Sequence, residues 1–170
     1  MRQMTAREVM NRKIIAVRDF WSVGKLASFL FEKSISGAPV LDSNGVLVGV
    51  VSLMDIARFE SEQHKVMIGK ESHDFFAQAG KPALLPEHLR AMQTSKSEET
   101  RVADIMMRAI FKVSPVASVQ SIARMMIESR IHRVLVVDER RGDELLGIVT
   151  TIDLLQVIRD LPAAPHEPEN

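Results

Sequence analysis

An internal repeat constrains the fold of this chain more than any other feature of its sequence. Gly49–Asp55 reads Gly-Val-Val-Ser-Leu-Met-Asp, and Gly147–Asp153, 98 residues further on, reads Gly-Ile-Val-Thr-Thr-Ile-Asp. Short β-branched runs favour strands. A hydroxyl residue followed three positions later by an acidic residue is typical of a helix start. Each phrase is therefore predicted to be a strand that runs directly into a helix.

The similarity extends backwards from the two phrases over most of each half of the chain. At an offset of 96, Met10 aligns with Met106 and Asp42 with Asp138, and two extra residues after Asp138 raise the offset to 98. A repeat of this length determines the architecture, because each copy is one supersecondary unit. We therefore interpret the chain as two copies of a single unit.

Each copy predicts a short helical turn, a strand, a helix, two strands and a closing helix. Ser22 and Ser118 are good N-caps for the longer helices, and Asn44-Gly45 between two apolar runs indicates a hairpin. One such unit buries too little surface to be stable alone. We expect an α/β (α+β) fold in which two β-α-β-β-α repeats stack sheet to sheet, with pseudo-twofold symmetry and two equivalent clefts. The expected elements are 6–10, 14–17, 23–31, 38–41, 46–51 and 54–61 in the first copy, and 102–107, 110–113, 119–127, 134–137, 145–149 and 152–160 in the second.

The domain boundaries follow from the repeat. We expect one domain at residues 1–61 and a second at 100–161, joined by a linker at 62–99 and followed by a disordered tail at 162–170, which contains three prolines. The linker is expected to hold one or two helices, near 62–68 and 86–92, and a mobile stretch before Arg101.

Composition argues against several classes of function. Lys plus Arg and Asp plus Glu are both 22, so the formal net charge is zero and nucleic acid is an unlikely partner. The chain has no cysteine, the N-terminus lacks an apolar signal core, and no apolar run approaches the roughly 18 residues of a membrane span. We therefore expect a soluble, cytoplasmic protein without a membrane partner.

Neither a metal site nor an active site is expected. The linker histidines His64, His73 and His88 lack a metal-binding spacing. There is no Walker loop, nucleophile elbow or GxGxxG motif. These observations argue against an enzyme.

The hydroxyl and carboxylate of each phrase allow two interpretations. Ser52 with Asp55, and Thr150 with Asp153, can simply cap a helix, with the carboxylate offsetting the helix dipole. Alternatively, a helix N-terminus attracts phosphate and a carboxylate can accept two hydrogen bonds from neighbouring ribose hydroxyls. The two interpretations are compatible, because a cap residue can also contact a ligand.

Taken together, these segments resemble a tandem pair of cystathionine-β-synthase (CBS) domains, or Bateman module, of the stand-alone bacterial type. The resemblance covers residues 4–61 and 100–161. It is carried by the two phrases, by the strand segments Ser36–Asp42 and Ile131–Asp138, and by the openings Val9-Met10 and Ile105-Met106.

The resemblance implies a regulatory protein that senses a nucleotide. Paired CBS domains bind adenosyl ligands such as AMP, ADP, ATP, NAD(H) or S-adenosylmethionine, and an AMP- or ATP-like ligand is expected here. It also implies a homodimer through the helical faces, with Leu26, Leu30 and Met126 as contacts, and a separate effector protein that receives the conformational change. The alternatives are a ligand-independent dimerisation or interaction module and, third, an enzyme.

The resemblance also implies the site residues. In the family the aspartate holds ribose and the hydroxyl residue approaches phosphate, and His132-Arg133 is similar to a phosphate-binding His-Arg pair in the nucleotide-binding subunit of the AMP-activated kinase. The alternative for this pair is a solvated position at a strand entrance. Ser36-Gly37 stands at the same place in the first copy, so only one cleft is expected to hold the charged pair. That cleft combines Ser52, Met54, Asp55, Ile110, Phe111, His132 and Arg133, and the other combines Ile14, Ile15, Gly37, Ala38, Thr150, Ile152 and Asp153.

Overall fold

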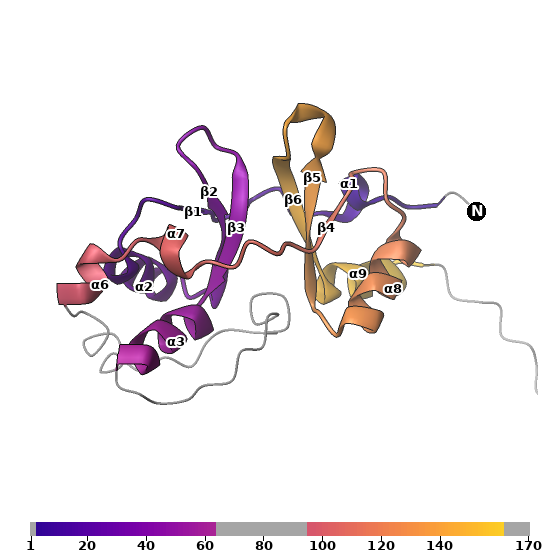
Figure 1. Cartoon of the computed structure of the whole chain (residues 1–170). Helices are drawn as coiled ribbons and strands as arrows, with labels where there is room; N and C mark the ends of the chain where they lie inside the picture. The colour runs from indigo at the N-terminus through magenta and orange to yellow at the C-terminus, as the bar shows by residue number, and fades with distance from the viewer. Residues whose placement is uncertain (1–2, 64–94, 162–170) are drawn as a thin grey trace, which may run out of the picture.

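The computed structural model describes residues 3–63 and 95–161 and contains two similar halves (Figure 1). Each half has one three-stranded sheet, ordered β1-β2-β3 or β4-β5-β6. The first stretch contains α1 (Ala6–Val9), β1 (Val17–Arg18), α2 (Val23–Glu32), β2 (Gly37–Leu41), β3 (Leu47–Ser52) and α3 (Leu53–Gln63). The second contains α6 (Ser95–Glu99), α7 (Val102–Ile105), β4 (Lys112–Val113), α8 (Val119–Ser129), β5 (Arg133–Asp138), a 3₁₀ turn (Glu139–Arg141), β6 (Glu144–Thr150) and α9 (Thr151–Arg159).

The two sheets have the same topology and equivalent registers. In each, the first strand is parallel to the second, and the second is antiparallel to the third. Val40 pairs with Gly49 in the first sheet, and Val136 pairs with Gly147 in the second. The predicted pseudo-symmetric α+β fold of two repeats is confirmed.

The core consists of two buried clusters, one of which joins the halves. Figure 1 shows the sheets next to each other at the centre of the molecule, with the helices towards the outside. Leu47 and Val50 of β3 belong to the same buried cluster as Val134 and Val149 of the second sheet. A second cluster lies between the first sheet and its helices, and includes Leu26 of α2. Burial between the sheets therefore makes one folded body of two units that are marginal alone.

The opening helix of each copy packs against the other copy. The Ala6 amide of α1 donates to the Ala117 carbonyl at 2.8 Å, and Asn11 and Ile148 exchange backbone hydrogen bonds of 2.8 and 3.0 Å. On the other side, Met107 and Val50 exchange bonds of 2.9 and 2.8 Å just after α7. The two halves are thus joined by reciprocal exchange of their opening segments.

The glycine of each repeated phrase, Gly49 or Gly147, lies where the opening segment of the other copy packs. A Cβ on Gly49 would lie 2.8 Å from the Met107 carbonyl oxygen, and one on Gly147 would lie 2.6 Å from Met10 Sδ and 2.9 Å from its Cβ. Real Cβ atoms almost never make such short contacts. The glycines therefore permit a close approach of the exchanged segments.

The helix caps and the hairpin that the sequence predicts are present in the structure. The hydroxyls of Ser22 and Ser118 each accept a hydrogen bond from the amide three residues later, at 3.1 Å in both cases. In the hairpin, Asp42 Oδ1 accepts from the Asn44 and Val46 amides, both at 2.8 Å, and Gly45 has φ of +83°. The predicted caps and hairpin are confirmed.

The first strand of each copy is shorter than predicted. Strand β1 begins at Val17 rather than Ile14, and β4 begins at Lys112 rather than Ile110. The physical reason for β1 is the exchange: Asn11 is already paired with Ile148 of the other half. The intervening residues cross between the sheets and leave two residues to pair with β2.

The stretch before Arg101, expected to be mobile, is helical from Ser95 to Glu99. Helix α6 packs on α2, where Ser97 is buried. Ser22 Oγ donates to Glu98 Oε2 at 3.2 Å. Tertiary packing therefore overrides a polar sequence. The expected helix at 86–92, most of that at 62–68 and the tail 162–170 lie outside the described residues.

The expected dimer contacts on α2 are wrong. Leu26 and Leu30 are both 0% exposed, because they fill the core of their own half. Met126 of α8 is only 5% exposed. Large exposed apolar side chains occur instead further along α8 and on α9.

Candidate functional site

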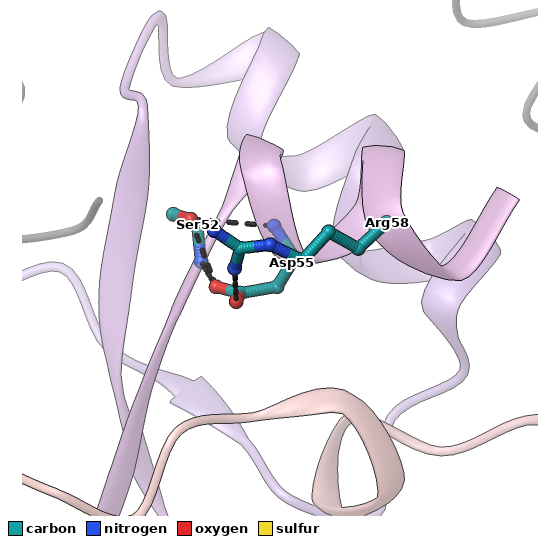
Figure 2. Close-up of polar contacts among 3 residues, drawn as sticks. All are labelled: Ser52, Asp55 and Arg58. Atoms are coloured by element: carbon teal, nitrogen blue, oxygen red, sulfur yellow. Dashed lines mark hydrogen bonds and ion pairs between the residues drawn. The ribbon is translucent and has the colours of Figure 1, made fainter. Parts of the chain in front are cut away.

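The first copy builds a buried polar cluster at the junction of β3 and α3, which we call the first half-site: Ser52, Asp55 and Arg58 (Figure 2). The Ser52 amide and hydroxyl donate to Asp55 Oδ2 at 2.7 and 2.8 Å, and the Asp55 amide lies 3.4 Å from Ser52 Oγ. Arg58 Nη1 contacts Asp55 Oδ1 at 3.1 Å. Both carboxylate oxygens of Asp55 therefore have donors.

The second copy builds the same arrangement between β6 and α9. The Thr150 amide and hydroxyl each donate to Asp153 Oδ2 at 2.7 Å, and the Asp153 amide lies 3.4 Å from Thr150 Oγ1. The capping interpretation is confirmed in both copies, because each hydroxyl residue and its aspartate form a capping box. We call Thr150, Asp153 and Gln156 the second half-site.

The two half-sites differ at one position. Arg58 follows Asp55 by three residues, and Gln156 follows Asp153 by three. Within residues 3–63 and 95–161, no hydrogen bond reaches Asp153 Oδ1. This oxygen is therefore available to a ligand, whereas its counterpart on Asp55 contacts a guanidinium.

Asp153 and Gln156 line a cavity of about 340 Å³ between α9 and the exchanged α1. Its volume is within the range of roughly 300–1,000 Å³ typical of small-molecule sites. Glu8 and Val9 of α1 form part of the opposite wall. The second half-site thus borders a cavity to which both copies contribute.

A smaller cavity of about 200 Å³ brings together three predicted residues, Ile14, Ile15 and Gly37, with two cations, Lys13 and Arg133. Arg133 was expected in the other cleft, and this cleft was expected to lack charge. The structure corrects both points. Burial lowers the pKa of the Arg133 guanidinium from its usual value, although arginine stays charged at physiological pH.

His132 is separated from Arg133. Its ring is exposed, Nδ1 lies 3.4 Å from Thr151 Oγ1, and its carbonyl accepts from the Thr151 amide at 2.9 Å. His132 lies on the groove between α8 and α9, not in the cavity with Arg133. The expected grip on a single phosphate by the His-Arg pair is not what this geometry shows.

The remaining predicted residues lie at several depths. Ala38 is fully buried in the cluster between the first sheet and its helices, and Ile152 on α9 is 61% exposed. Ile110 and Phe111 are partly buried and pack against the core between the halves. Met54, at the start of α3, is half-buried.

Sequence reasoning missed three polar residues of these sites: Lys13, Arg58 and Gln156. Each of them lies close in the sequence to a residue that was predicted for the site. Residues three apart on a helix are neighbours, so Arg58 and Gln156 follow from the positions of the two aspartates. Lys13 adjoins Ile14, which was predicted to line a cleft.

The described part of the chain offers no group of three or more His, Asp or Glu side chains that could hold a metal ion. Among the helices of residues 3–63 and 95–161, none combines the length and the apolar character that a membrane crossing requires.

Two stacked repeats, with a capped carboxylate in each and cavities at their junction, define a CBS-type pair. The sequence matches the CBS domain family twice, at residues 6–62 and 102–160. The chain therefore belongs to the CBS domain family.

Relatives and solved structures support this assignment. The chain is 30% identical to uncharacterised protein MJ1426 of Methanocaldococcus jannaschii, covering 91% of each. It is 29% identical to the chloroplastic CBS domain-containing protein CBSX2 of Arabidopsis thaliana, of which it spans 58% and which covers 86% of this chain.

Among solved structures, CBSX2 in complex with AMP has a TM-score of 0.63 at 24% identity, covering 91% of this chain and 96% of that one. The CBS domain pair of MJ0100 with 5'-methylthioadenosine and S-adenosyl-L-methionine has a TM-score of 0.60 at 19% identity, covering 93% and 98%. These two likenesses show the fold.

Proposed function

We propose that this chain is a regulatory module that senses an adenosyl nucleotide between its two CBS repeats. The observation that carries the proposal is Asp153, whose Oδ2 is held by Thr150 while no described residue bonds its Oδ1, beside a cavity of about 340 Å³. Solved proteins of the same fold hold AMP, or 5'-methylthioadenosine and S-adenosyl-L-methionine. An AMP- or ATP-like ligand fits the proposal best, because two cations, Lys13 and Arg133, line the smaller cavity of about 200 Å³.

Groups that match the parts of such a ligand line two cavities, with Asp153 in the larger and Lys13, Ile14, Ile15 and Arg133 in the smaller. Asp153 Oδ1 can accept hydrogen bonds from ribose hydroxyls. The N-terminus of α9 carries a partial positive charge that favours phosphate. Lys13 and Arg133, which line the smaller cavity, add two full charges. Ile14 and Ile15 supply apolar surface for the base.

The exchange of opening segments gives the module its means of signalling. The cavity beside Asp153 is walled by α1 from one copy and α9 from the other. A ligand that contacts both walls stabilises one relative placement of the halves over others, and its differential affinity sets the size of that shift. We propose that a separate effector protein in the cytoplasm responds to it, and that this chain performs no catalysis.

A thermal-shift screen tests the proposed function. At about a hundred times Kd a ligand stabilises by about 2.7 kcal/mol, which corresponds to roughly 5–10 °C in Tm for a chain of this size. We expect AMP, ATP or S-adenosylmethionine to produce such a shift, and ribose 5-phosphate, which lacks the base, to produce little. No shift with any adenosyl ligand at millimolar concentration would contradict the proposal.

The outer face of the second copy supports the homodimer expected for the family. Four large apolar side chains on α8 and α9 are exposed: Ile127 (76%), Ile152 (61%), Leu155 (52%) and Ile158 (63%). Three of them, Ile127, Leu155 and Ile158, line a groove of about 470 Å³ between the two helices. Groove and projecting side chains belong to the same face, so two copies related by a twofold axis can fill each other's grooves. We propose a second copy of the chain as the occupant.

The substitution Ile158→Glu is expected to convert the dimer into a monomer, because it places a charge in the centre of an apolar interface. Sedimentation velocity measures the change in mass. The matched control is Val116→Glu, which removes an equally exposed apolar side chain (75%) that precedes α8 and does not line the groove. An Ile158→Glu variant that sediments as the wild type would rule out this interface.

A further inference from the structure

The cavity of about 200 Å³ is lined by a buried hydroxyl that the fold does not use. Ser36 is only 5% exposed, and its carbonyl accepts from the Leu53 amide at 2.9 Å, which holds the residue just before β2. Within residues 3–63 and 95–161, the Ser36 hydroxyl forms no hydrogen bond. Buried polar groups in folded proteins nearly always have a partner. A buried hydroxyl that borders a cavity therefore indicates a partner that enters the cavity.

The other polar groups of this cavity favour an anion as that partner. Lys13 and Arg133 contribute two positive charges, Ser34 contributes a second hydroxyl, and no Asp or Glu is among the described residues that line it. Burial disfavours the charged form of the Arg133 guanidinium and lowers its pKa, so an anion beside it interacts more strongly than in water. A guanidinium has five N–H donors, and one partner within the protein does not exhaust them.

The size of the cavity limits the kind of anion. Its volume of about 200 Å³ is below the roughly 300–1,000 Å³ typical of sites for whole small molecules, so a phosphate group fits better than a complete nucleotide. The several oxygens of a phosphate can accept hydrogen bonds from a hydroxyl, an ammonium and a guanidinium at the same time.

We propose that this cavity binds a phosphate group, to which Ser36 donates a hydrogen bond while Lys13 and Arg133 supply the charge. The same chemistry serves a phosphate that belongs to a nucleotide and one that is free in solution. The inference does not depend on an adenosyl ligand beside Asp153, because the two cavities share no lining residue.

A phosphate in this cavity joins the two copies. Lys13 lies in the opening segment of the first copy, where its amide donates to Asn11 Oδ1 at 2.9 Å, and Arg133 is the first residue of β5 in the second. The two positive charges repel each other, and an anion that contacts both attracts them instead. Binding of phosphate is therefore expected to stabilise the junction of the copies.

Calorimetric titration with pyrophosphate at constant ionic strength tests the site without any adenosyl group. Ser36→Ala is expected to weaken binding about tenfold, because it removes a hydrogen bond to a charged group. Lys13→Gln is expected to weaken binding about two- to fivefold, as is typical of an exposed charge. The matched control is Arg12→Gln, which removes a positive charge from the neighbouring residue. Arg12 does not line the cavity, so this variant should keep the wild-type affinity.

Parallel titrations with AMP and adenosine identify the source of the phosphate. For a phosphate that belongs to a nucleotide, Ser36→Ala and Lys13→Gln lower the affinity for AMP and leave that for adenosine unchanged. For a free anion, the two variants change the binding of pyrophosphate alone. If neither variant changes the affinity for pyrophosphate or the ratio of AMP to adenosine affinity, the inference is overturned, and AMP binding that persists leaves the proposed function intact. A wild type that binds pyrophosphate but no adenosyl ligand would overturn the proposed function and support this site.

Discussion

Replacing Gly147 by valine is expected to lower the free energy of unfolding by about 2–3 kcal/mol, a typical cost of overpacking a well-filled interior. A Cβ at this position would lie 2.6 Å from Met10 Sδ and 2.9 Å from Met10 Cβ. The thioether can turn away, but the Cβ of Met10 moves only with its backbone. That backbone is held nearby by the bonds between Asn11 and Ile148, 2.8 and 3.0 Å long.

Urea unfolding measures the change, and the control places the same residue on the same strand. Glu144→Val adds a β-branched side chain at an exposed position of β6 and is expected to change stability by no more than about 0.5 kcal/mol. Gly49→Val should repeat the loss, since its Cβ would lie 2.8 Å from the Met107 carbonyl oxygen. A Gly147→Val variant as stable as the control would show that the exchanged segment is not tightly packed.

The features of the fold that could be predicted are those encoded locally. The caps at Ser22 and Ser118 and the hairpin at Asp42 each depend on a few neighbouring residues, and all form as expected. The exchange of opening helices could not be predicted in the same way. Met10 and Met106 occupy equivalent positions in similar sequences, so the local pattern fits packing on either copy. The choice is made by long-range contacts.

The same reasoning explains the partial prediction of the candidate site. The aspartates of both copies follow from the repeated phrase, and both form the expected capping boxes. The sequence predicts that His132 and Arg133 share one cleft, but the two side chains line different cavities. Arg133 is the first residue of β5, and successive side chains along extended backbone point to opposite faces. Adjacent residues therefore line different cavities.

The double variant Asp55→Asn, Asp153→Asn is expected to remove most of the ligand-dependent thermal shift. Asparagine keeps one carbonyl oxygen, which can still accept from the amide and hydroxyl of Ser52 or Thr150. The NH₂ group that replaces the second carboxylate oxygen only donates, so it cannot accept a hydrogen bond from a ribose hydroxyl. Loss of hydrogen bonds to a charged group, each worth about 1.5–3 kcal/mol, should weaken binding by roughly a hundredfold at each half-site.

At a ligand concentration of about a hundred times the wild-type Kd, such weakening reduces the shift from roughly 5–10 °C to about 1 °C. The control is Asp42→Asn, which makes the same chemical change in the hairpin turn, where asparagine serves as well as aspartate. It should retain the full shift. If instead the double variant kept the wild-type shift, neither carboxylate would contact the ligand.

The single variants Asp55→Asn and Asp153→Asn show which half-site contributes more to binding. Asp153→Asn should cost more of the adenosine response than Asp55→Asn, because Arg58 already occupies Oδ1 of Asp55.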